Sequence, residues 1–219
     1  MGRSDLEIPN DIGCLDTPNL RAQFMSGLGF YCDAWQVSRL FLRDDKRLIR
    51  NYIIKRYRLP CSMREIQFYQ QDYMELRAQL GPMVPKAMFL QTRVDGEVTV
   101  VAVARAVTRW FNIANPTFED DVVPLLRNLT KARAQLRDFV SAAHRWYESS
   151  EMKVIDLYGM DNLVLDNKQD IRYLDSFNVF FYPDTFHAID EANEVLEEKI
   201  AVSRRRLEYL QYLLDQTRP

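Results

Sequence analysis

The sequence predicts an α+β protein in which a β-rich half precedes an α-rich half. Three observations support this: β-branched and aromatic runs fill the first half, one amphipathic helical segment interrupts them, and longer helical segments dominate the remainder. The 219 residues suffice for one sizeable domain or two small lobes. We expect a lead-in over residues 1–23, a β-rich lobe over 24–107 and an α-rich lobe over 108–219.

The β-rich lobe should begin with a hairpin whose turn contains glycine. Gly27 and Gly29 stand between two strand-like runs, and Asp44-Asp45-Lys46 is typical of a second hairpin tip. The run 51–57 is rich in β-branched and aromatic residues, which favours a third strand.

A helix should follow the third strand. Ser62 and Glu65 have the spacing of a capping box, and Gly81-Pro82 should end the helix near residue 80. Two more strands, 88–93 and 97–107, are separated by Asp-Gly, which favours a tight hairpin turn.

The second half changes to helical periodicity. After a hinge near residues 107–112, helices are expected over 120–129 and 130–149, and a long charged helix over 185–215. Between them, short strands should cover 153–157, 163–166 and 171–175, with a hairpin turn over 166–170.

Charge and cysteine content argue against several function classes. The formal net charge of −2 argues against nucleic acid as a partner, and Arg204-Arg205-Arg206 is most simply a solvated helix face.

Cys14, Cys32 and Cys61 form no C-x-x-C pair, so neither a zinc site nor a disulfide framework is predicted. This suits a reducing compartment, and we expect a cytoplasmic protein, acting in its own cell or in another. No apolar run is long enough to predict a membrane span.

A group of polar residues in the second half could serve phosphoryl transfer. Asp156 follows a short apolar run, Asn162 precedes the next one, and Asp175 comes thirteen positions later. A carboxylate can orient or deprotonate an attacking hydroxyl, and an amide oxygen with a second carboxylate can hold Mg²⁺ against phosphates.

This pattern resembles the protein-kinase-like superfamily, and in particular its aminoglycoside phosphotransferase and choline kinase branch. The resemblance covers about residues 24–182 and five elements in the family's chain order. The elements are Gly27-Leu28-Gly29, Ile53-Ile54-Lys55, the helix with Glu65, the segment Asp156–Asn162, and Asp175-Ser176-Phe177.

The resemblance implies a minimal two-lobed kinase-like fold, similar to short bacterial kinase-like proteins. It implies ATP- and Mg²⁺-dependent transfer of the γ-phosphoryl group to an unidentified hydroxyl, on a small molecule or a protein. For the nucleotide, the resemblance implies that Lys55 contacts the phosphates and pairs with Glu65, and that the loop with Gly27 and Gly29 covers the phosphates. It implies that the backbone of 104–108 binds the adenine. For the reaction, it implies catalysis by Asp156 and Mg²⁺ binding by Asn162 and Asp175.

Departures from the family pattern keep other interpretations open. Asn162 stands six positions after Asp156, where the family usually has five, so a pseudokinase that binds or regulates is the alternative. Glu65 could serve only the helix cap, with Glu75 the other candidate partner for Lys55. An unrelated α+β interaction protein is a third possibility.

Overall fold

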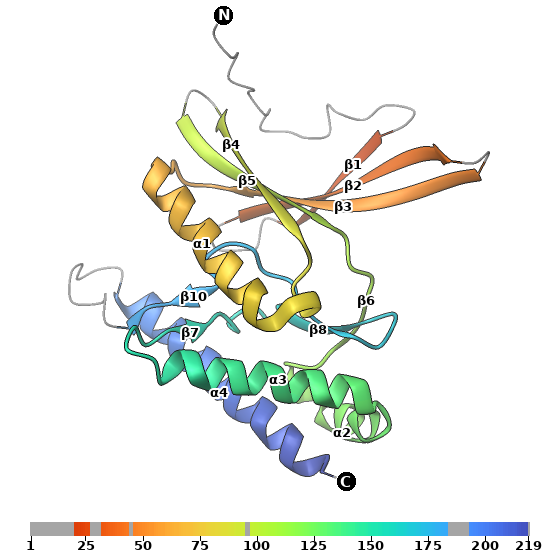
Figure 1. Cartoon of the computed structure of the whole chain (residues 1–219), viewed down its shortest axis with the longest axis vertical. Helices are drawn as coiled ribbons and strands as arrows, with labels where there is room; N and C mark the ends of the chain where they lie inside the picture. The colour runs from red at the N-terminus through yellow and green to blue at the C-terminus, as the bar shows by residue number, and fades with distance from the viewer. Residues whose placement is uncertain (1–19, 27–31, 44–45, 95–96, 184–192, 219) are drawn as a thin grey trace, which may run out of the picture. The chain divides into compact units, whose positions relative to one another are not determined.

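A computed structural model describes residues 20–26, 32–43, 46–94, 97–183 and 193–218, and it has the α+β character that the sequence predicts (Figure 1). The contacts divide the chain into two compact units. One contains the residues up to Gln71 and Lys86–Ala106, and the other contains Asp72–Pro85 and the residues from Val107 onward.

A five-stranded antiparallel sheet forms the first unit, in the order β1-β2-β3-β5-β4. The strands are β1 (Leu20–Ser26), β2 (Cys32–Arg43), β3 (Lys46–Tyr57), β4 (Ala87–Val94) and β5 (Glu97–Arg105). The strands predicted for this half are thus confirmed, and the third is longer than expected. Gly27 and Gly29 lie outside the described residues.

Helix α1 (Met63–Leu80) is inserted between β3 and β4, and its capping box is confirmed. The Ser62 N–H donates to Glu65 Oε2 at 2.7 Å, and the Glu65 N–H donates to Ser62 Oγ at 3.3 Å. The helix ends at Leu80, and the φ of +56° at the next residue, Gly81, is a left-handed conformation that glycine adopts readily. Tyr57 on β3 and Tyr69 on α1 have ring centroids 5.2 Å apart, so this helix covers the sheet face that bears Tyr57.

Strands β2 and β3 continue beyond their neighbours in the sheet (Figure 1). The pairing of β1 with β2 stops at Arg39, and the pairing of β5 with β3 starts at Tyr52. Within the described chain, residues 40–43 and 46–49 pair only with each other. We call residues 39–43 and 46–50 the β2–β3 ribbon.

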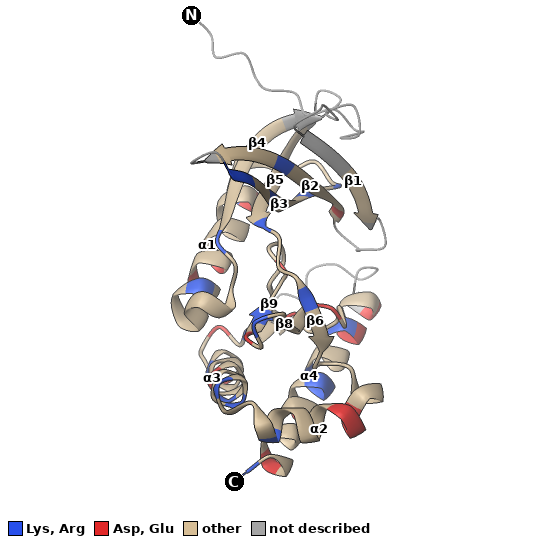
Figure 2. Ribbon diagram, turned by 90° about the vertical axis from the view of Figure 1, so that its right-hand side faces the viewer, with Lys and Arg blue, Asp and Glu red and all other residues tan. Residues whose placement is uncertain are grey.

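Among its described residues, the second unit contains the C-terminal half of α1, three further α-helices and two small antiparallel sheets. Its elements are β6 (Arg109–Asn112), α2 (Glu119–Asn128), α3 (Thr130–Tyr147), β7 (Val154–Ile155), β8 (Leu163–Asp166), β9 (Ile171–Tyr173), β10 (Phe180–Phe181) and α4 (Asn193–Gln216). The acidic first turn of α2 (red in Figure 2) lies at the positive end of the helix dipole, where carboxylates stabilise a helix.

The sequence did not predict β6 and β10. Residues 109–112, which we expected to belong to a hinge, pair with β8, and β10 pairs with β7. Both are short strands whose partners lie far along the chain, so local patterning cannot reveal them. No helix among the described residues has the length and apolarity needed to cross a membrane.

Candidate functional site

Asp156 opens the loop that connects β7 to β8, which we call the Asp156–Asn162 loop. Its N–H donates to the Val179 carbonyl at 2.9 Å, so the residue is fixed at the end of the β7–β10 pair. The side chain is buried, and Oδ1 accepts the Tyr158 N–H at 2.7 Å. This local turn gives the carboxylate one orientation.

Asn162 closes the loop on itself. Its Nδ2 donates to the Asp156 carbonyl at 3.2 Å, and its N–H donates to the Gly159 carbonyl at 3.1 Å. Its own carbonyl accepts the Leu174 N–H at 2.8 Å. The six-residue spacing therefore forms a compact hydrogen-bonded loop.

Tyr173, which is fully buried, supports this loop from β9. Its hydroxyl donates to the Asp156 carbonyl at 2.9 Å. Burial, and then the charges of Asp156 and Asp175, hold the pKa of Tyr173 well above its usual value, so the phenol stays neutral and keeps its donor proton. The Phe139 ring packs 6.1 Å from the Tyr173 ring, between centroids.

Asp175 follows two positions after Tyr173. It is half-buried, and its Oδ1 accepts the Ser176 N–H at 2.8 Å. The Tyr173 hydroxyl and Asn162 Nδ2 both donate to the Asp156 carbonyl, and the N–H of Leu174, the neighbour of Asp175, donates to the Asn162 carbonyl. The second unit thus gathers the three polar residues predicted from the sequence around one tyrosine.

Helix α4 holds the same loop from another side. Ser203 Oγ accepts the Leu157 N–H at 3.1 Å, and the Arg206 guanidinium donates to the carbonyls of Leu157 and Tyr158. Interpreting the whole Arg204–Arg206 run as a solvated face was therefore wrong for Arg206.

Lys199 is the second cation that α4 brings to the loop. It is 2% exposed, and its Nζ lies 5.9 Å from the centroid of the Tyr158 ring. Burial lowers the pKa of Lys199, and the negative charge of Asp156 opposes this shift. The part that α4 plays at this loop was not predicted from the sequence. Lys199, Ser203 and Arg206 are spaced four and three apart, which would have placed them on one helix face.

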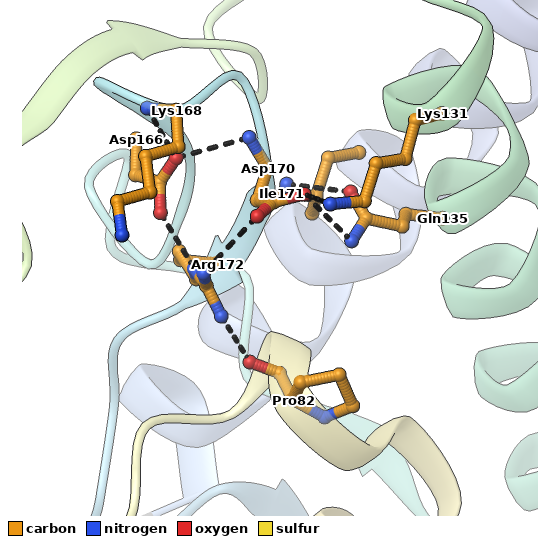
Figure 3. A network of polar contacts seen from close by, with 8 residues as sticks. All are labelled: Pro82, Lys131, Gln135, Asp166, Lys168, Asp170, Ile171 and Arg172. Carbon is orange, nitrogen blue, oxygen red and sulfur yellow. Dashed lines mark hydrogen bonds and ion pairs between the residues drawn. The ribbon is translucent and has the colours of Figure 1, made fainter.

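A polar network fixes the β8–β9 hairpin that leads to Tyr173 and Asp175 (Figure 3). Asp166 Oδ1 accepts the Lys168 and Asp170 N–H groups at 2.8 and 3.0 Å, and Oδ2 accepts Arg172 Nε at 2.8 Å. Although burial alone would raise it, the pKa of Asp166 is held below its usual value by these bonds. The predicted turn over 166–170 is confirmed.

The same hairpin is tied to α3 (Figure 3). Gln135 accepts the Ile171 N–H at 2.9 Å and donates to Asp170 at 3.3 Å, while Lys131 pairs with Asp170 at 2.5 Å. Arg172 also donates to the Pro82 carbonyl, which follows α1. Side chains from several elements thus hold the backbone that presents Asp175.

Lys55 and Glu65 belong to the first unit. Lys55 is half-buried on β3, paired with Ala34 of β2 and Ala102 of β5. It lies two positions before Tyr57, so strand alternation places it on the sheet face that α1 covers. The Glu65 carboxylate is engaged in the helix cap, and hydrogen bonds from Ser62 lower its pKa.

Glu75, the other candidate partner, is engaged within the second unit. Its carboxylate pairs with the buried Lys153 at 2.8 Å, and Lys153 also pairs with Glu151 at 2.7 Å. The carboxylate of Asp161, beside Asn162, accepts hydrogen bonds from the Arg109 guanidinium at 2.9 Å and from Asn112 Nδ2 at 3.1 Å. These bonds join the loop to β6.

Only two of the oxygen-bearing side chains predicted from the sequence, those of Asn162 and Asp175, are candidates to hold a metal here. Among the described residues, no group of three or more His, Cys, Asp or Glu could hold a metal by itself. Asn162 Nδ2 is engaged with the Asp156 carbonyl, which leaves the amide oxygen as the side-chain atom that could hold a cation, together with the Asp175 carboxylate. Mg²⁺ commonly takes only one or two protein oxygens and completes its shell with phosphate oxygens and water.

No family model matches the chain, and no curated protein was found to be similar to it.

Gly159 leads to a prediction about the loop. A Cβ at this position would lie 2.6 Å from Asn162 Oδ1, so Gly159→Ala must displace the Asn162 side chain. We expect a loss of about 1 to 3 kcal/mol in the free energy of unfolding, measured by urea denaturation. The double variant Gly159→Ala/Asn162→Ala should cost less than the sum of the two single changes, because the clash is gone. Strictly additive costs would contradict the contact.

Proposed function

We propose that the protein is an ATP- and Mg²⁺-dependent phosphotransferase that moves the γ-phosphoryl group to a hydroxyl, with a two-lobed kinase-like fold. The observation that carries the proposal is the closure of the Asp156–Asn162 loop by Asn162 Nδ2 and its support by Tyr173, which gathers Asp156, Asn162 and Asp175. These are the residue types that phosphoryl transfer requires: a carboxylate for the hydroxyl and two oxygen ligands for the metal.

Each residue has a defined task under this proposal. Asp156 accepts the proton of the attacking hydroxyl through the carboxylate that the Tyr158 N–H orients. Asn162 and Asp175 would hold Mg²⁺, which neutralises phosphate charge when it is bound. Lys55 is assigned to the nucleotide phosphates. Catalysis is then mostly positioning and electrostatic stabilisation.

Three further features support the proposal. A helix is inserted between the third and fourth strands of the five-stranded sheet, Lys55 lies on the sheet face that this helix covers, and a fixed hairpin leads from Asn162 to Asp175. All three agree with the order of elements that underlies the resemblance to the protein-kinase-like superfamily.

A thermal-shift titration with ATP and MgCl₂ tests the nucleotide site. A ligand that binds only the folded state stabilises it, and about one hundred times the Kd should raise the melting temperature by roughly 5 to 10 °C. We expect Asp175→Ala to abolish the Mg²⁺-dependent part of this shift. The matched control is Asp138→Ala, an exposed carboxylate on α3, which should respond like the wild type. An absent shift in the wild type at millimolar nucleotide would refute the proposal.

One observation favours the pseudokinase as a second candidate. The Asp156 carboxylate already accepts the Tyr158 N–H, and two buried or half-buried cations of α4, Lys199 and Arg206, feel its charge. A carboxylate engaged in this way is less available to the proton of an attacking hydroxyl. Nucleotide binding without transfer would identify this alternative.

A further inference from the structure

The β2–β3 ribbon exposes aliphatic side chains on both of its faces. Cross-strand pairs share a face, so Leu42 and Ile49 lie on one face, with Leu40, while Leu48 lies on the other, with Phe41. Leu42 is 76% exposed, Ile49 66% and Leu48 42%. A two-stranded ribbon has no core in which to bury such side chains.

The same ribbon is strongly basic. Between residues 39 and 50 the sequence has five basic and two acidic residues, a net charge of +3 in a chain whose formal total is −2. The guanidinium carbons of Arg39 and Arg50 lie 4.9 and 5.2 Å from the centroid of the Phe41 ring. Arg39, Lys46, Arg47 and Arg50 form no ion pair with an acidic group in the described ranges. Among the described residues, no acidic side chain neutralises these four charges.

From this combination we infer that the β2–β3 ribbon binds the surface of an anionic lipid bilayer. Lysine and arginine side chains are attracted to acidic headgroups, and aliphatic side chains gain by leaving water for the boundary with the acyl chains. Both properties occur together on the ribbon, and its positive charge is opposite in sign to the net charge of the rest of the chain. The protein would thus sit peripherally on the bilayer, independently of whether it transfers phosphate.

The two-faced exposure is what favours a bilayer over other partners. A folded protein could cover one face of the ribbon and would leave Leu48 or the Leu42–Ile49 pair in water, whereas an interfacial medium surrounds both faces. A single-stranded nucleic acid would use cations with exposed aromatic rings, but Phe41 is half-buried beneath the ribbon's own arginines and the exposed residues are aliphatic. A duplex would use the cations alone and would leave the exposed aliphatic side chains in water.

The test is co-sedimentation of the full chain with vesicles. We expect binding to phosphatidylcholine vesicles that contain about 30 mol% phosphatidylserine, little binding to pure phosphatidylcholine, and weaker binding as salt rises. Leu42→Ser/Ile49→Ser and Lys46→Gln/Arg47→Gln should each reduce affinity at least about tenfold. The changed residues are exposed, so melting temperatures should stay near that of the wild type.

The matched controls change exposed apolar and basic residues elsewhere in the first unit. Leu59 and Met88, 57% and 56% exposed, are replaced by Ser, and the exposed Arg64 and Lys86 by Gln. These variants should sediment like the wild type. Equal binding to both vesicle types, absence of binding, or ribbon variants that bind normally would overturn the inference. So would a ribbon-dependent dimer in light scattering, or ribbon-dependent binding of labelled duplex DNA without vesicle binding.

Discussion

Replacing Asp156 by Asn is expected to lower the rate of phosphoryl transfer by about 10²- to 10⁴-fold, because the residue would lose its capacity to accept a proton. The Asn side chain retains an oxygen that can accept the Tyr158 N–H, so the loop should remain folded. Nucleotide binding should persist, since the proposed metal ligands are Asn162 and Asp175. ADP release from Mg·ATP, with water as the acceptor, gives a readout that needs no identified substrate.

Asp161→Asn is the matched control for this experiment. Asp161 belongs to the same loop, but its carboxylate accepts Arg109 and Asn112. Its transfer rate should stay close to that of the wild type. If Asp156→Asn releases ADP as fast as the wild type, the assignment of the catalytic carboxylate is wrong. A wild type that is stabilised by Mg·ATP yet releases no ADP would identify the pseudokinase.

Asp72 should make the protein less stable as pH rises from about 4 to about 6. It is 4% exposed, its Oδ1 accepts the Tyr182 hydroxyl at 2.5 Å, and its buried Oδ2 has no hydrogen-bond partner among the described residues. Burial raises the pKa of Asp72 to about 6, against opposing effects of the Tyr182 hydrogen bond and the Lys153 charge, while Glu75 and Glu151 raise it further. The folded state then binds a proton that the unfolded chain has already released.

The expected loss is on the order of 3 kcal/mol, complete above about pH 6. Three other carboxylates have lowered pKa values: Asp33, Glu65 and Asp166. The stability that they contribute is lost as pH falls toward and below the ordinary pKa of a carboxylate, which is the opposite direction of change from that expected for Asp72. Urea denaturation between pH 4.5 and 7.5 measures the profile.

Three variants separate the causes of this pH dependence. Asp72→Asn should flatten the profile, because the variant has no charge to bury. Tyr182→Phe removes a bond that lowers the pKa of Asp72, so it should shift the loss of stability to higher pH. The exposed control Asp138→Asn should keep the wild-type profile. A profile that Asp72→Asn leaves unchanged would rule out this carboxylate as its source.

The sequence predicts elements well where their signals are local. The capping box at Ser62 and Glu65, the stop at Gly81 and the turn after Asp166 are each determined by residues within a few positions, and each is confirmed. The strands β6 and β10 were not predicted, because their stability comes from partner strands far along the chain.

The candidate site shows the same division. The sequence singled out Asp156, Asn162 and Asp175, and the second unit gathers them. It could not show that Asn162 would donate to the Asp156 carbonyl, or that α4 would supply Lys199 and Arg206. The bond of Asn162 spans only six positions, but it depends on the exact course of the loop. The α4 contacts depend on tertiary packing, which brings together residues 46 and 49 positions apart.

The tight approach of Asn162 to Gly159 also constrains how the loop can change in evolution. Since the carboxamide occupies the space that a Cβ at 159 would fill, the two positions cannot vary independently. A homologous chain with a larger residue at 159 should have a smaller one at 162, and would then lack the amide assigned to the metal. Under the proposed function, paired changes at these two positions would mark lineages that have lost the metal ligand assigned to position 162.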